Sequence, residues 1–218
     1  MMRDVIIREV EDTKVVAIVR GVYGQDCINL ANALYHGGIR LLEVTFDQSG
    51  NIPLTKTSET IYRLTQALGD KMVFGAGTVT SMEMLDLAMD AGAKFIVSPN
   101  VNEAIIKATV AAGLVSMPGA MTPTEVQAAY EYGADFVKVF PAGTLGTSYL
   151  KAIRGPINHV RLLAVGGINE KNAIDFLKAG ACGVGVGGNL VNKDWIAEGA
   201  FDKITSLARA LVENVSHV

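Results

Sequence analysis

The chain has 218 residues, 50% of them hydrophobic, and its formal net charge is −3. Basic residues are scattered rather than clustered, so the sequence lacks the positive patch that binding to nucleic acid or an anionic membrane surface requires. The length suits one domain with a sizeable core, and no Pro/Ser-rich linker or charged block interrupts it. We therefore expect residues 1–218 to form a single domain.

The amino-terminal segment carries charged residues where a signal peptide needs an apolar run, and no apolar stretch is long enough to span a bilayer. Cys27 and Cys182 lie far apart and form neither a disulfide framework nor a CxxC metal motif. His36, His159 and His217 show no ligand spacing, so we expect no metal site. These features predict a cytoplasmic protein without a membrane partner.

Glycines that can end helices recur along the chain, and an apolar, β-like run lies close after each. Their spacing is the length of one helix, one strand and two short loops. Helical patterns such as residues 82–89 and 172–178 lie between the apolar runs, which are Val/Ile/Leu/Phe-rich as strands covered on both faces must be. The expected strands are 14–20, 39–46, 72–77, 94–99, 114–118, 135–141, 160–166 and 182–187.

Eight strands alternating with eight helices predict an α/β fold, a single (β/α)8 TIM barrel. A doubly wound open sheet is the alternative, but no GxGxxG follows the first expected strand. A barrel of this kind carries its active site at the carboxyl ends of the strands. Polar and glycine residues gather at those ends: Arg20 and Gly21; Glu43, Thr45 and Asp47; 75–78; 98–100; 117–119; Lys138 and Phe140; Gly166 and Gly167; and 187–189.

Lys138 lies alone in the middle of an apolar strand. The strand period of two places it on one face with Phe136 and Phe140. A buried ammonium without a partner tends to lose its proton, and the neutral amine is the nucleophile that a Schiff-base enzyme needs. Two other interpretations are an edge-strand lysine that discourages aggregation and a lysine that extends to solvent.

Glu43 shares a strand face with Leu41 and Thr45. An ionisable group inside an apolar strand needs a partner, and Lys138 is expected to point into the same barrel centre. The pair is either a buried ion pair without catalytic use or a site where Glu43 transfers protons for chemistry at the lysine.

Double glycines close the last two strands, at Gly166–Gly167 and Gly187–Gly188. Free backbone N–H groups there could converge on a phosphate, although tight turns also use double glycine. Gly75-Ala76-Gly77-Thr78 would let a ligand approach the backbone, with Thr78 as a hydrogen-bond donor; a crowded barrel layer would explain the same small residues.

Taken together, these residues resemble the 2-keto-3-deoxy-6-phosphogluconate (KDPG) aldolase / 4-hydroxy-2-oxoglutarate (KHG) aldolase family over nearly the whole chain. The matching segments are 16–20, 37–45, 75–79, Ser98–Pro99, Pro118–Gly119 with 122–125, 136–142 and 166–168.

The resemblance implies a class I, metal-independent aldolase that cleaves a keto acid to pyruvate and an aldehyde without a cofactor. Lys138 then forms the Schiff base with pyruvate, and Glu43 relays protons. Arg20 and Thr78 line the pyruvate site, and the family is generally homotrimeric. We expect the substrate site to include also Thr45, Pro99, Phe140, Gly166, Gly167, Gly187 and Gly188.

The chain departs from the family pattern at four positions. Asp47 stands where familiar members carry an arginine that holds the substrate's acid or phosphate end, and Asn189 replaces a serine. Val165 and Asn100 replace a threonine and a glycine. A carboxylate at position 47 predicts a weaker preference for phosphorylated aldehydes. Alternatively, Asp47 points away and caps the segment that follows it, and Gln48 and Ser49 take over the contact with the substrate.

Two other functions are compatible with a barrel of this kind. One is a non-catalytic barrel that binds sugar acids or phosphates, which needs the glycine loops but not Lys138 and Glu43 facing each other. The other is a phosphate-gripping isomerase or epimerase in which the lysine acts only through its charge.

Overall fold

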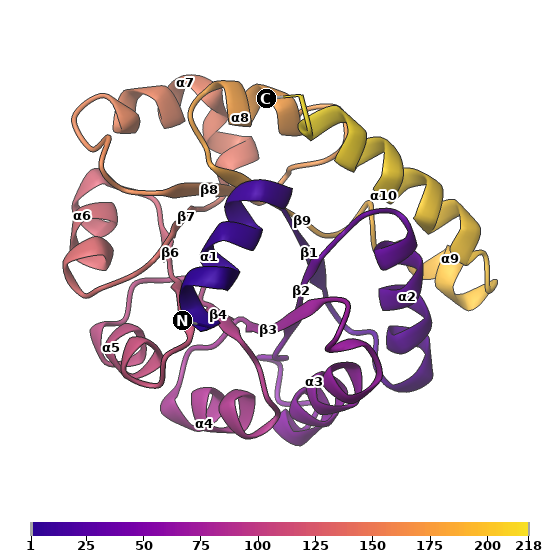
Figure 1. Cartoon of the computed structure of the whole chain (residues 1–218). Coiled ribbons are helices and arrows are strands. Elements are labelled where there is room, and N and C mark those ends of the chain that lie inside the picture. Colours follow the sequence, from indigo (N-terminus) through magenta and orange to yellow (C-terminus); the bar gives the residue numbers. More distant parts are fainter. Residues whose placement is uncertain (1, 218) are drawn as a thin grey trace.

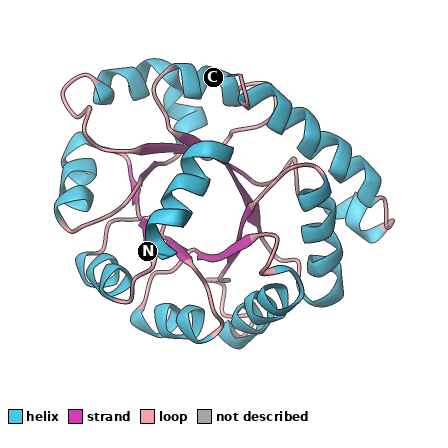
Figure 2. Ribbon diagram, in the orientation of Figure 1, coloured by secondary structure: helices cyan, strands magenta, loops and turns pink. Residues whose placement is uncertain are grey.

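Parallel strands and helices alternate along residues 2–217, the part of the chain that the computed structural model describes (Figures 1 and 2). The strands are β1 Val15–Val19, β2 Leu41–Thr45, β3 Val73–Gly77, β4 Phe95–Val97, β5 Val115–Met117, β6 Gly119–Ala120, β7 Val137–Val139, β8 Leu162–Val165 and β9 Gly183–Val186. The helices are α1 Met2–Thr13, α2 Gly24–His36, α3 Leu54–Leu68, α4 Met82–Asp90, α5 Glu103–Ala111, α6 Pro123–Glu131, α7 Ala142–Arg154, α8 Ala173–Lys178, α9 Lys193–Ala197 and α10 Phe201–Val215. No helix in this part of the chain is long and apolar enough to cross a membrane.

The strands form one parallel sheet in the order β5-β4-β3-β2-β1-β9-β8-β7-β6. Of its two outer strands, β5 lies within the expected fifth strand, 114–118, whereas β6 begins just beyond that range. Pro118 separates them, because proline has no backbone N–H for the ladder. The Pro118 carbonyl accepts from the Lys138 amide at 2.8 Å, and the Ser116 carbonyl accepts from Asp135 and Phe136. These bonds close the barrel, so the predicted (β/α)8 fold is confirmed.

The alternation of side chains along each strand separates two apolar layers. On β7, Val137 and Val139 pack outward among the surrounding helices, whereas Phe136 and Lys138 point inward. Leu42 and Val44 on β2 likewise face the helices, and Leu41 joins the inner layer. The inner layer also includes Val16, Phe95, Val97, Val115, Met117, Leu163 and Val165.

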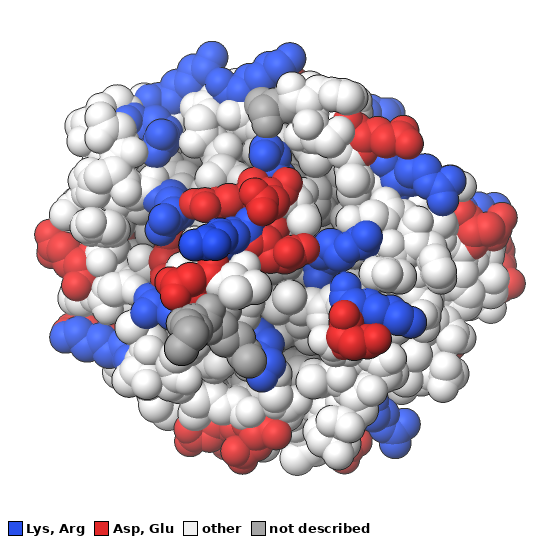
Figure 3. Space-filling view, viewed as in Figure 1, with Lys and Arg blue, Asp and Glu red and all other residues white. Residues whose placement is uncertain are grey.

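Helix α1, which the sequence analysis did not predict, lies across the barrel end at which the strands begin (Figure 1). Its Ile6 and Val10 pack into the inner apolar layer. Acidic and basic groups are interspersed over the same face of the molecule (Figure 3). Two ion pairs join α1 to the barrel: Arg3 with Asp135 at 2.8 Å and Glu11 with Arg161 at 2.6 Å.

Removing the Asp135 carboxylate should loosen α1. Asp135 is almost buried and accepts hydrogen bonds from Arg3 Nε and from the Ser116 amide, at 3.1 and 2.9 Å. We expect Asp135→Ala to lower the free energy of unfolding by about 2 kcal/mol, because two charge-assisted hydrogen bonds are lost and their donors stay partly buried. Urea titration measures the change.

Lys107→Ala is the control, since it removes one partner of an exposed ion pair within α5. Its cost should be at most about 0.5 kcal/mol. If Asp135→Ala cost no more than this control, the Arg3–Asp135 contact would not hold α1 to the barrel.

Candidate active site

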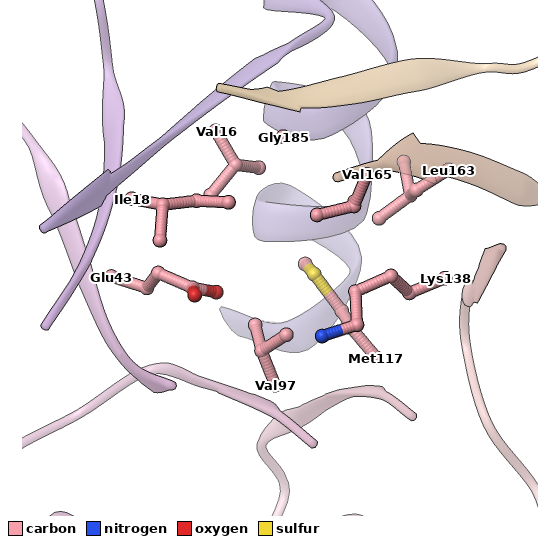
Figure 4. Close-up of a pocket in the computed structure, with 9 residues that line it drawn as sticks. All are labelled: Val16, Ile18, Glu43, Val97, Met117, Lys138, Leu163, Val165 and Gly185. Carbon is pink, nitrogen blue, oxygen red and sulfur yellow. The ribbon is translucent and has the colours of Figure 1, made fainter. Parts of the chain in front are cut away.

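Glu43 and Lys138 approach the barrel centre from opposite walls, since three strands separate β2 from β7 along the sheet through β1. Figure 4 shows the Glu43 carboxylate and the Lys138 ammonium pointing toward the same space. The two residues are only 4% and 8% exposed. The sequence prediction that they point into one barrel centre therefore agrees with their positions.

Apolar side chains surround the space between the two charged groups. They are Val16, Ile18, Val97, Met117, Leu163 and Val165 (Figure 4). The cavity enclosed there has a volume of about 10 Å³, which is about the room that one water molecule needs. The space between this carboxylate and the lysine can therefore hold one water molecule.

The side chains of Glu43 and Lys138 are not joined by a hydrogen bond or an ion pair in the described residues. Within residues 2–217, the Glu43 carboxylate accepts no hydrogen bond, and no ion pair joins it to Lys138. Lys138 Nζ lies 5.1 Å from the centroid of the Phe140 ring. Both charged ends thus remain available to a ligand, which distinguishes them from a buried pair that only stabilises the fold.

Burial sets the protonation of both groups. It raises the pKa of Glu43 to about 7, while the positive charges of Lys138 and Arg20 act in the opposite direction. Burial also lowers the pKa of Lys138; the Glu43 carboxylate opposes this shift and Arg20 adds to it. A carboxyl group with a pKa near neutrality can give and take protons in turn, and a lysine with a lowered pKa supplies more of the nucleophilic amine.

The absence of a side chain at Gly77 lets the Glu43 carboxylate lie against the backbone of β3. A β-carbon there would lie 2.5 Å from Glu43 Oε1. Thr45 lies beside this contact but is 2% exposed and does not line the cavities around Lys138. Its hydroxyl has no hydrogen-bond partner in the described part of the chain, and its expected role in substrate binding stays a prediction.

A larger cavity of about 580 Å³ opens above Lys138 at the carboxyl ends of the strands. Ten predicted site residues line it: Arg20, Glu43, Thr78, Pro99, Lys138, Phe140, Gly166, Gly167, Gly187 and Gly188. Thr78 has a φ of +59°, which is costly for a β-branched residue. Strained backbone of this kind concentrates at functional sites.

The two glycine loops present unpaired backbone donors to the cavity. Gly166 and Gly167 have φ values of +88° and +74°, and a β-carbon on Gly166 would lie 2.9 Å from the Phe140 ring. In the described residues, no acceptor is bonded to the amides of four cavity-lining residues: Gly167, Ile168, Gly188 and Asn189. Free N–H groups that converge from two loops suit an oxyanion.

Asp47 does not line the cavity. Its carboxylate accepts hydrogen bonds from the amide and the hydroxyl of Ser49, with the amide at 3.1 Å. Asp47 thus turns away and caps the segment that follows it, as in the alternative interpretation. Gln48 and Ser49, which that interpretation expects to contact the substrate, do not line the cavity. Asn189, at another departure from the family pattern, lines the cavity and donates to Glu170 Oε2 at 3.2 Å.

The sequence analysis missed several residues that line the cavity. Ile18 lies two positions before Arg20, so strand alternation could have placed it on the same face. Asn169 lies two positions after Gly167, and its loop position could have suggested it.

Burial of Glu43 can be tested by titration. With ¹³C-labelled glutamate, we expect one carboxyl resonance with a midpoint near pH 7, and Glu43→Gln should remove it. Because the Lys138 charge lowers the pKa of Glu43, Lys138→Met should move the midpoint upward. A midpoint near 4.5, the ordinary value, would contradict the desolvation of this carboxyl group.

The chain matches known proteins over nearly its full length. The family model for KDPG and KHG aldolase matches residues 6–207. The 2-dehydro-3-deoxy-phosphogluconate aldolase of Treponema pallidum is 34% identical over 96% of this chain and 97% of its own. The 2-dehydro-3-deoxy-6-phosphogalactonate aldolase of Escherichia coli is 30% identical over 92% and 95%.

A solved structure extends the likeness to three dimensions. The KDPG aldolase of Legionella pneumophila, with pyruvate captured at low pH as a covalent carbinolamine, superposes with a TM-score of 0.82. The two sequences are 29% identical, and the match covers 92% of this chain and 95% of that one. The barrel, the match of the family model and the curated relatives agree, and the chain belongs to the KDPG and KHG aldolase family.

Proposed function

We propose that the protein is a class I aldolase, a carbon–carbon lyase that reversibly cleaves a 2-keto acid to pyruvate and an aldehyde through a Schiff base on Lys138. The observation that carries the proposal is the buried, unpaired Glu43 and Lys138 facing each other beneath an open cavity. A lysine with a lowered pKa in this position is suited to attack a carbonyl carbon.

The covalent cycle uses only these two side chains. The neutral Lys138 amine adds to the C2 carbonyl of the keto acid, and loss of water from the carbinolamine gives an iminium ion. The iminium accepts the electron pair of the C3–C4 bond while Glu43 takes the proton of the C4 hydroxyl, so that the aldehyde leaves. Protonation of the remaining enamine at C3, followed by addition of water, releases pyruvate and restores the amine.

The rest of the cavity binds the ends of the substrate. Arg20 and Thr78 hold the carboxylate of the pyruvate half, and Pro99 and Phe140 form its walls. The free amides of the two glycine loops, those of Gly167, Ile168, Gly188 and Asn189, bind the far end of the aldehyde half, where a terminal oxyanion suits N–H donors.

The proposed substrates are 2-keto-3-deoxy-6-phosphogluconate, its unphosphorylated form and 4-hydroxy-2-oxoglutarate, which yield glyceraldehyde 3-phosphate, glyceraldehyde and glyoxylate respectively. Relatives are named for aldolases of both sugar acid and 4-hydroxy-2-oxoglutarate types. The turn of Asp47 toward Ser49 keeps its carboxylate out of the cavity, so it does not repel a phosphate there. The lack of an arginine at this position still favours a weaker preference for phosphate than is usual in the family.

Family membership also supports three further proposals, that residues 1–218 act as a single catalytic domain, that the protein assembles as a homotrimer and that it works in the cytoplasm.

The covalent step can be trapped. Incubation with pyruvate and borohydride should add one reduced pyruvate to the tryptic peptide that contains Lys138. Lys138→Arg keeps the positive charge but cannot form an imine, because guanidinium is not deprotonated in proteins. The variant should be neither trapped nor active. Near-normal cleavage by Lys138→Arg would refute the covalent mechanism. Absence of both trapping and cleavage in the native chain would favour the isomerase or the non-catalytic alternative.

Proton transfer by Glu43 should be separable from binding. Glu43→Gln keeps the shape of the side chain but cannot take a proton, so kcat should fall by about 10²–10⁴-fold. Equilibrium binding of pyruvate analogues should change little. A decrease of less than about tenfold at every pH would mean that Glu43 only balances the charge of Lys138.

A further inference from the structure

A second cavity of about 320 Å³ adjoins the catalytic one beyond the end of β1. The two cavities share four lining residues, so they lie next to each other at the Gly187–Gly188 loop. The shared residues are Ile18, Arg20, Gly187 and Gly188; Val191 and Lys193 complete the second cavity.

The side chain of Lys193 runs back from α9 toward the end of β1. A β-carbon on Gly21 would lie 3.2 Å from Lys193 Nζ, so the absence of a side chain at Gly21 leaves room for the ammonium beside the neighbouring Arg20. In the described residues, Lys193 has no ion-pair partner, hydrogen bond or aromatic contact.

The charged lining of the second cavity is wholly positive. Arg20 and Lys193 both line it, whereas Glu170 and Asp194, the acidic residues on the neighbouring loop and helix, do not. Its wall also carries Gly188, whose amide donates to no acceptor in the described residues. Because Arg20 holds the carboxylate of the pyruvate half in the proposed function, Lys193 and the Gly188 N–H are the groups left for a second oxyanion. A cation and a free N–H attract an oxyanion more strongly than a neutral hydroxyl.

We propose that Lys193 is a specificity-determining residue that binds the terminal oxyanion, phosphate or carboxylate, of the aldehyde half of the substrate. The proposal rests on the proposed aldolase function, because that function puts the far end of the substrate at the Gly187–Gly188 loop. A lysine suits this role because its flexible stem carries a compact charge that can meet terminal groups at different distances from Lys138.

The position also explains how the chain can bind an anionic end without an arginine at position 47. Asp47 is engaged with Ser49 outside the cavity, and Lys193 supplies a cation from the other side, after β9. The cation that recognises the far end thus comes from a different loop of the barrel.

The test compares three substrates that differ at the far end. 2-Keto-3-deoxy-6-phosphogluconate ends in a phosphate, 4-hydroxy-2-oxoglutarate in a carboxylate and 2-keto-3-deoxygluconate in a neutral hydroxyl. For Lys193→Gln we expect kcat/KM to fall about 10- to 100-fold on an anionic substrate, as loss of a charged hydrogen bond predicts. On the neutral substrate it should change less than about threefold.

Lys178→Gln is the matched control, because it removes one exposed positive charge from the last turn of α8, at the opposite end of the barrel. It should change none of the three values by more than about threefold. Borohydride trapping of pyruvate is measured on each variant, since Lys193 should not affect imine formation.

The outcomes separate the two proposals. A selective loss on the phosphate compound assigns a phosphate to Lys193, and a selective loss on the dicarboxylate assigns a carboxylate. An equal loss on all three substrates, or no loss, overturns the role of Lys193 even though pyruvate is still trapped at Lys138. Absence of trapping in the native chain would instead refute the aldolase function.

Discussion

The site depends on the burial of two ionisable side chains, Glu43 and Lys138, that no ion pair joins. Glu43 and Lys138 are both nearly buried in an apolar barrel, yet neither neutralises the other through an ion pair. Transfer of such groups out of water costs several kcal/mol each unless their protonation shifts. The rest of the fold, with its two apolar layers and closed sheet, must stabilise this arrangement. Burial raises the pKa of Glu43 to about 7 and lowers the pKa of Lys138.

Closure of the barrel at one end controls where water and substrate can enter. Helix α1 inserts Ile6 and Val10 beneath the charged pair, and its ion pairs to Asp135 and Arg161 hold it there. The larger cavity is lined by residues at the carboxyl ends of the strands. A substrate therefore meets Lys138 from the side that carries the glycine loops, with its reacting carbonyl toward the apolar interior.

Strand periodicity predicted the centre of the site because it depends only on local geometry. The lone lysine of β7 and the lone glutamate of β2 each have one inward direction once the strand faces are known, and closure of the barrel then sets them opposite each other.

The directions of side chains in the loops could not be predicted in the same way. Whether Asp47 faces the cavity depends on its bond to Ser49, and the place of Lys193 depends on the bare backbone of Gly21. Such contacts form between side chains and backbone in three dimensions, and periodicity carries no information about them. Helix α1 was also not predicted. Of its described side chains, only Ile6 and Val10 are buried, and two residues are too few to make an amphipathic pattern evident.

Strands and loops contribute different residues to the site. The chemistry rests on side chains of β2 and β7, whose directions are set by the sheet and cannot change without altering the barrel. In the proposed function, recognition of the far end rests on loops after β1, β8 and β9, which supply backbone amides and the flexible side chain of Lys193. A substitution in these loops, at Asn189 for example, would change what the far end of the substrate contacts without moving Lys138 or Glu43. This separation would let one covalent mechanism serve substrates with different terminal groups.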